Sequence, residues 1–163
     1  DPKVEVRQMV FSEHNWHVYK NHERMVRFGD FVYIKNNYPA QPNLCYESDT
    51  HYPAGAELWK AHAAGKTNPQ QQQVFANPCP GEELFRLGKD PHQFTDLAKN
   101  PKYAKTLNQA RRLIANWTRQ TGDTIPENPT PHRHAPRRAS KTGKSSPPAR
   151  PKRGTLTAKC PVP

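Results

Sequence analysis

The chain has 163 residues, of which 33% are apolar, and its formal net charge is +11. This composition supplies one modest core, or part of a larger one, and excludes a large independent core. No apolar run approaches the roughly 20 residues that cross a bilayer, so we expect no membrane partner. The sequence begins at Asp1 without a basic and apolar leader, and we therefore expect no targeting segment in it.

The positive charge is concentrated at the end of the chain. No acidic residue follows Glu127, whereas nine Lys and Arg residues do, and without these nine the net charge is only +2. Residues 123–163 are also rich in Pro, Ser and Thr and contain few aliphatic residues. Such a segment cannot bury enough apolar area to offset its chain entropy, so we predict a basic tail that is disordered or merely draped on a surface. The predicted boundary divides the chain into residues 1–122 and residues 123–163.

The sequence predicts β-structure in the first half of the ordered region. Apolar residues at positions 4–11 predict a strand that runs into a polar and aromatic cluster at residues 12–17. A hairpin follows, because β-rich residues 24–28 and 31–36 flank the turn pair Gly29-Asp30. Residues 37–55 contain many Pro, Asn and Tyr residues and are expected to form an irregular loop.

The second half is mainly helical. Residues 56–64 predict a helix that ends at Gly65 and uses Leu58 and Trp59 as core contacts, and a second helix follows a cap at Asn68. Residues 83–87 read as a short strand. The last helix has an apolar stripe at helical spacing and ends at Gly122, the stripe being Tyr103, Leu107, Ala110, Ile114 and Trp117. We therefore predict an α+β fold in which a small antiparallel sheet carries a carboxy-terminal helix on one face.

One dense group of polar residues is a candidate binding site. It comprises residues 13–17, with the sequence Glu-His-Asn-Trp-His, and residues 22–24, with the sequence His-Glu-Arg. Imidazole, carboxylate and indole groups together can bind a polar, anionic or sugar-like ligand, although an ordinary surface histidine cluster has the same composition. Cys45, Cys79 and Cys160 are widely separated and have no metal-ligand spacing. Neither a nucleophile elbow nor a glycine-rich phosphate loop is present, so we expect no catalytic residue and no metal site in this chain.

Two blocks of the sequence resemble the late part of sulfatases of the alkaline-phosphatase superfamily, most closely the bacterial group related to heparan N-sulfatase (N-sulfoglucosamine sulfohydrolase). The first block comprises residues 11–17, 23–27 and 30–36. The second comprises residues 82–87, the Asp-Pro-His turn at 90–92, the Asp-Leu-Ala step at 96–98, Leu107 and Trp117. The likeness spans roughly residues 7–122. The departures, Phe85-Arg86, His92, Phe94 and Asp96, fall at turn and packing positions, where we expect the fold to tolerate them.

The resemblance implies that this chain is the carboxy-terminal subdomain of a larger α/β sulfatase fold, with the missing amino-terminal domain as its partner. That domain would carry the Cys-x-Pro-x-Arg motif converted to formylglycine and the calcium ligands, and neither Cys79 nor Cys160 fits the motif, because Pro directly follows each. The implied substrate is a sulfated sugar or polysaccharide, and the implied location is periplasmic or secreted. His17 and His14 would contact the substrate, and Glu13 would do so or would orient an imidazole.

Two other readings stay open. The basic tail could bind polyanions by charge alone, either sulfated polysaccharide or nucleic acid, although no aromatic residue follows Trp117 to stack on bases. The sequence therefore argues against nucleic acid as a partner. Alternatively, the chain could be a truncated remnant without function.

Overall fold

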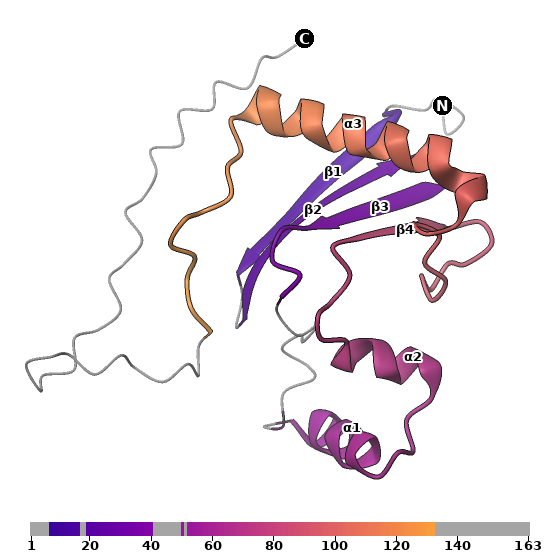
Figure 1. The fold of residues 1–163 in the computed structure, drawn as a ribbon, viewed down its shortest axis with the longest axis vertical. Helices are drawn as coiled ribbons and strands as arrows, with labels where there is room; N and C mark the ends of the chain where they lie inside the picture. The colour runs from indigo at the N-terminus through magenta and orange to yellow at the C-terminus, as the bar shows by residue number, and fades with distance from the viewer. Residues whose placement is uncertain (1–6, 17–18, 41–49, 51, 133–163) are drawn as a thin grey trace, which may run out of the picture.

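The computed structural model describes residues 7–16, 19–40, 50 and 52–132 (Figure 1). Its centre is a four-stranded antiparallel sheet in the order β1-β2-β3-β4, made of β1 (Met9–Trp16), β2 (Lys20–Phe28), β3 (Phe31–Asn36) and β4 (Glu82–Arg86). The helices are α1 (Pro53–Ala63), α2 (Pro69–Gln72) and α3 (Ala104–Thr121), with short 3-10 turns at Gln73–Phe75 and Pro101–Tyr103. The predicted small antiparallel sheet with a carboxy-terminal helix is confirmed.

The strand register divides the sheet into two faces. Directly opposed residues share a face, because side chains alternate along each strand. One face, here called the α3 face, is built from three cross-strand rows: Met9, Phe28, Phe31 and Arg86; Phe11, Val26, Tyr33 and Leu84; Glu13, Arg24, Lys35 and Glu82. The opposite face, here called the open face, is built from Val10, Arg27, Val32 and Phe85; Ser12, Met25, Ile34 and Glu83; His14, Glu23 and Asn36.

The core lies between the α3 face and α3. Leu107, Ala110 and Ile114 of α3 are buried in one cluster with Val26, Phe28, Tyr33 and Leu84 of the sheet. Trp117 continues the same stripe and stacks on Phe11, with ring centroids 5.7 Å apart. Asn100 accepts a hydrogen bond from Lys102 N before the helix, and Gly122 ends it in the left-handed conformation at φ 68°. The predicted stripe and the predicted helix end at Gly122 are confirmed.

The hairpin between β2 and β3 also matches its prediction. Phe28 pairs with Phe31, so the turn contains only Gly29 and Asp30. Gly29 has φ 51°, a conformation that glycine adopts without the steric cost borne by other residues. Asp30 then secures the neighbouring strand end, because its carboxylate accepts from Gly88 N at 2.7 Å and from Arg86 Nε at 2.8 Å.

The first strand differs from its prediction. β1 runs from Met9 to Trp16, so the polar cluster expected to follow the strand is itself part of it. Pairing with β2, including Ser12 with Met25 and His14 with Glu23, supplies backbone hydrogen bonds that the local sequence did not reveal. Residues 4–6 and His17 lie outside the described residues.

The packing predicted for the first helix is wrong. Trp59 is 37% exposed, and its ring meets Phe75 edge to face at 4.9 Å rather than joining the core under α3. In Figure 1, α1 and α2 lie beyond the β4 side of the sheet, whereas α3 crosses it. The second helix begins as predicted: Asn68 and Gln71 form reciprocal capping hydrogen bonds. For Trp59, a hydrophobic pair between two helical segments thus replaces the expected contact with the core.

The segment that follows α3 contacts the sheet. Residues 123–132, which lie beyond the predicted boundary at Gly122, run back to the sheet and bond to it (Figure 1). Trp16 Nε1 donates to the Pro131 carbonyl at 2.9 Å, and Lys20 N donates to His132 Nδ1 at 3.0 Å. Residues 133–163 lie outside the described residues, so the disorder and polyanion binding of the basic tail stay predictions.

Candidate functional site

The predicted site residues Glu13 and His14 do not face each other. They are neighbours on β1, so Glu13 lies on the α3 face and His14 on the open face. The expectation that Glu13 orients an imidazole is therefore wrong for His14. The carboxylate beside His14 is that of Glu23, whose Oε2 lies 3.2 Å from His14 Nδ1. His17, the other predicted substrate residue, lies outside the described residues.

His14 is positioned as a solvent-facing binding group. Its side chain is 50% exposed, and Nδ1 contacts both Glu23 and the side-chain amide of Asn21, the latter at 3.1 Å. With Nδ1 engaged by these two groups, Nε2 faces outward and can form a hydrogen bond with a sugar hydroxyl or, as N–H, donate to an anion. This arrangement can bind or transfer a proton, and Glu23 fixes the ring orientation.

The other polar residues of the predicted cluster are part of the core. His22 is 1% exposed and Arg24 is 2% exposed. Arg24 donates to both carboxylate oxygens of Asp123 at 2.7 Å, and its Nη2 lies 2.8 Å from His22 Nε2. His22 Nε2 also lies 3.2 Å from the Thr124 carbonyl, and Nδ1 lies 2.8 Å from Asn37 Nδ2, so both ring nitrogens have polar partners.

The electrostatics of this buried cluster support a structural role. Burial, and then the neighbouring charge of Arg24, lower the pKa of His22, so the ring is held neutral. The hydrogen bond from Arg24 lowers the pKa of Asp123, so that carboxylate is held ionised. The space beside them is about 70 Å³, enough for water but not for a sugar. The cluster therefore anchors the segment after α3 to β2.

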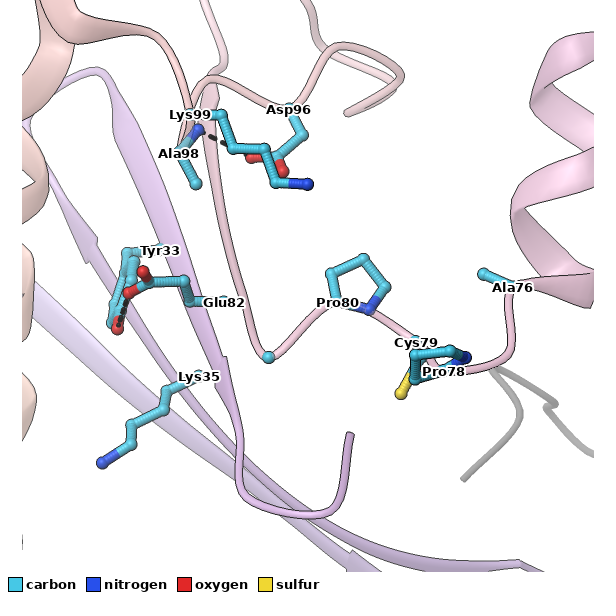
Figure 2. Close-up of a pocket in the computed structure, with 11 residues that line it drawn as sticks. Tyr33, Lys35, Ala76, Pro78, Cys79, Pro80, Glu82, Asp96, Ala98 and Lys99 are labelled. Atoms are coloured by element: carbon cyan, nitrogen blue, oxygen red, sulfur yellow. Dashed lines mark hydrogen bonds between the residues drawn. The ribbon is translucent and has the colours of Figure 1, made fainter. Parts of the chain in front are cut away.

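A cavity lies between the β3–β4 end of the α3 face and the loop after α2 (Figure 2). Its volume of about 670 Å³ is in the range of small-molecule sites. Tyr33, Lys35, Glu82, Asp96 and Lys99 provide its polar groups, and Pro78, Cys79 and Pro80 line the opposite side.

The carboxylates of this cavity are already engaged within the fold. Glu82 pairs with Arg111 and accepts from Tyr33 Oη at 3.0 Å, and the Arg111 contact lowers the pKa of Glu82. Asp96 accepts from Leu84 N at 2.9 Å and from Ala98 N at 2.8 Å. Figure 2 shows the ammonium groups of Lys35 and Lys99 at separate places rather than converging on one point. The cavity has the size of a ligand site, but its charged groups do not converge on one ligand.

Neither the nucleophile nor the metal of a sulfatase fits the described residues. Cys79 is 6% exposed and burial raises the pKa of its thiol, so it stays protonated and unreactive. No group of three His, Cys, Asp or Glu residues in the described ranges could hold a metal ion. The carboxylate of Asp90, for example, accepts hydrogen bonds from the backbone amides of Phe94 and Thr95 in its own turn. Cys45 and Cys160 lie outside the described residues.

Sequence reasoning missed Glu83, which lies on the open face in the row of Met25 and Ile34. Burial raises the pKa of its carboxyl to about 7, and the negative charges of Asp96 and Glu23 add to the shift. The alternation of side chains along β4 would have placed Glu83 on the face of the sheet that Leu84 does not occupy. Only the pairing of β4 with β3 shows that this other face is also apolar.

No protein-family model matches the chain. An ulvan-active sulfatase of Formosa agariphila is 36% identical over 107 residues, which cover 64% of this chain and 18% of that protein. A Delta 4,5-hexuronate-2-O-sulfatase of Bacteroides thetaiotaomicron is 42% identical over 43 residues, covering 26% of this chain and 9% of that protein. The chain's sequence relatives are sulfatases.

The chain spans less than a fifth of the length of these sulfatases. A solved structure of a 2-O GAG sulfatase aligns with a TM-score of 0.43 and 22% identity, over 73% of this chain and 18% of that chain. The predicted closeness to heparan N-sulfatase is not confirmed by these sulfatases. In the part of the chain that the structure describes, no helix is both long and apolar enough to cross a membrane.

Proposed function

We propose that this chain is the carboxy-terminal subdomain of a sulfatase that removes sulfate ester or N-sulfate groups from a sulfated sugar or polysaccharide. The observation that carries the proposal is the 36% identity over 107 residues with the ulvan-active sulfatase. The coverage of only 18% of that protein leaves room for a much larger catalytic part. A polysaccharide substrate agrees with the periplasmic or secreted location that the resemblance implies.

In this proposal the formylglycine nucleophile and calcium belong to polypeptide outside this chain, as the resemblance implies. This chain would supply a wall of the substrate pocket through His14, held by Glu23 at 3.2 Å, and through His17. An imidazole in that wall can hydrogen-bond the sugar or protonate the leaving oxygen or nitrogen. Glu13 lies on the α3 face, whereas His14 lies on the opposite face. A substrate bound at His14 would therefore contact Glu13 only by extending past the outer edge of β1.

The first test is activity. The isolated 163-residue chain with calcium should not turn over an aryl sulfate or a sulfated glucosamine, because neither Cys79 nor Cys160 fits the motif that is converted to formylglycine. A hybrid sulfatase, in which this chain replaces the matching segment of the ulvan-active sulfatase, should hydrolyse sulfated polysaccharide. Multiple turnover by the isolated chain would contradict the proposed division of labour.

The second test is the role of the imidazoles in the hybrid sulfatase. Replacing His17 or His14 by Ala should lower kcat by roughly 10²- to 10⁴-fold if that ring protonates the leaving group. If the ring only contacts the sugar, KM should rise while kcat changes little. His92→Ala is the matched control, because His92 is an exposed imidazole that stacks on Phe94 in a turn. Equal effects of all three substitutions would argue against a pocket role.

A further inference from the structure

The segment that contains α3 is strongly basic. Residues 97–122 include no Asp or Glu, and all of their charged side chains are cations that the structure leaves exposed: Lys99, Lys102, Lys105, Arg111, Arg112 and Arg119. The chain without its tail cations has a net charge of only +2, whereas these six cations and no acid give residues 97–122 a charge of +6. The charge of the folded part is therefore concentrated on and beside one helix.

Three of these cations form a line along α3. Lys105, Arg112 and Arg119 are seven residues apart, which is close to two helical turns, so their side chains project from the same side at intervals of about 10 Å. Each residue turns the helix by about 100°, and this places the line on the side opposite the stripe of Leu107 and Ile114 that packs on the sheet. The three cations, here called the basic line, therefore face away from the sheet.

Side-chain amides lie between the cations of the basic line. Gln109 and Asn116 are exposed at the intervening turns, and Arg119 Nη2 donates to Asn116 Oδ1 at 2.9 Å. An amide can donate to a sulfate oxygen and can donate to or accept from a sugar hydroxyl. The indole of Trp117 lies on the other side of α3, where it stacks on Phe11. The outward side of α3 thus provides charge and hydrogen bonds without an aromatic platform for stacking.

The basic line also differs from the other cations that the structure pairs with acids. Arg24, Arg86 and Arg111 each have a carboxylate within ion-pair distance, those of Asp123, Asp30 and Glu82. Within the described ranges, no carboxylate forms an ion pair with any cation of the basic line. An anionic ligand can therefore bind these three side chains without first breaking an ion pair of the described fold.

We propose that the outward side of α3 is a second binding surface for a sulfated polysaccharide, in which the basic line holds successive sulfate groups of the polymer. This inference rests on the proposed function, which supplies the polymeric substrate. A linear sulfated polymer presents a row of negative charges, and a row of cations at regular intervals complements it. α3 covers the face of the sheet opposite His14 and Glu23, so this surface retains the polymer without contacting the reacting group. Retention raises the effective concentration of the polymer at the enzyme.

Heparin binding to the full 163-residue chain tests the surface directly. A triple variant replaces the basic line by glutamine, which keeps the helix and removes the charge: Lys105→Gln, Arg112→Gln and Arg119→Gln. Its Kd for heparin should rise at least about tenfold, and the dependence of log affinity on log salt should flatten by up to about one unit for each cation lost, because each bound cation releases counterions. Its thermal midpoint should change little, because all three side chains are exposed.

Two control variants remove the same charge elsewhere. One changes exposed lysines on other described elements: Lys60→Gln, Lys66→Gln and Lys89→Gln. The other changes three lysines of the tail: Lys141→Gln, Lys144→Gln and Lys152→Gln. Each should raise the Kd for heparin by less than about threefold, since only the net charge changes. A loss in either control as large as that in the α3 variant would overturn the proposal, and so would tighter binding of double-stranded DNA than of heparin at the same salt concentration.

Kinetics of the hybrid sulfatase separate this inference from the proposed function. The α3 variant should raise KM for a sulfated polysaccharide several-fold and leave kcat unchanged, whereas kcat/KM for an aryl sulfate should not change, because a small substrate does not extend to α3. An active hybrid whose KM for the polymer is unaffected overturns the second surface and leaves the function standing. An inactive hybrid, together with selective loss of heparin binding in the α3 variant of the isolated chain, supports the surface and counts against the function.

Discussion

On the α3 face, the buried guanidinium of Arg24 finds its partners within the chain, because Asp123 binds it with both oxygens at 2.7 Å and His22 lies 2.8 Å away. On the open face, the partly buried carboxyl of Glu83 has two acidic neighbours, and burial raises its pKa to about 7. The strands are the same for both faces. The comparison shows that the buried charge of the α3 face is paired within the described residues, whereas the carboxyl of Glu83 lies beside other acids.

The largest expected effect comes from breaking the charge pair of the α3 face. Asp123→Ala leaves the Arg24 guanidinium buried without its partner and should lower the free energy of unfolding by about 3–5 kcal/mol. The control is Arg111→Ala, which removes an ion pair with Glu82 whose Arg side chain is 48% exposed. That change should cost no more than about 1 kcal/mol, because exposed pairs are screened by water. Urea unfolding of both variants measures the difference, and equal losses would contradict the buried role of Arg24.

A smaller difference in stability is expected when apolar side chains on the two faces are truncated. Leu84 is 0% exposed under α3, so Leu84→Ala should cost about 2–5 kcal/mol by leaving a cavity. Ile34 is only partly buried in the isolated chain, and Ile34→Ala should cost clearly less, about 1 kcal/mol, since less apolar area leaves water. Urea unfolding of the isolated chain again provides the measurement. A cost for Ile34→Ala as large as that for Leu84→Ala would mean that the open face is covered within this chain.

The smallest expected effect is an opposite pH response of the two faces. The pKa of Glu83 is raised from 4.5 to about 7 in the folded chain, so the folded state binds its proton more tightly and stability falls as pH rises through that window. The pKa of His22 is lowered from 6.5, so the unfolded state takes up a proton first and stability falls as pH drops below 6.5. Glu83→Gln should therefore raise stability above pH 7 by on the order of 1 kcal/mol, a modest value because the carboxyl is partly exposed.

The matched variant for this pH comparison is His22→Gln, which should flatten the acid side of the stability profile instead. Thermal unfolding of both variants across the acidic and neutral range gives the measurement. A Glu83→Gln profile that keeps the wild-type fall between pH 4.5 and 7 would show that Glu83 does not carry it.

Local sequence chemistry predicted the elements that depend on neighbouring residues. Gly29 and Asp30 specify a two-residue turn, and the stripe from Tyr103 to Trp117 specifies which side of α3 is buried. The same reasoning failed for Trp59, since an aromatic residue on a short helix contacts whichever apolar group lies near in space. Here that group is Phe75, on the neighbouring 3-10 turn, rather than the sheet.

The candidate site shows the same limit. The polar cluster around Glu13 and His14 was visible in the sequence, but its division between two faces was not, because the division depends on where β1 starts and how it pairs with β2. The carboxylate that holds His14 is Glu23, nine residues away on the neighbouring strand, and that contact required the register.

The sequence by itself determined the order and type of the elements and the buried stripe of α3, since each depends on residue types within a few positions. Only the tertiary structure decided that Arg24 pairs with Asp123, 99 residues away, and that Glu83 shares a face with Met25 and Ile34. The physical reason is that burial and charge pairing depend on which strands become neighbours, and the register that sets this is a property of the whole sheet.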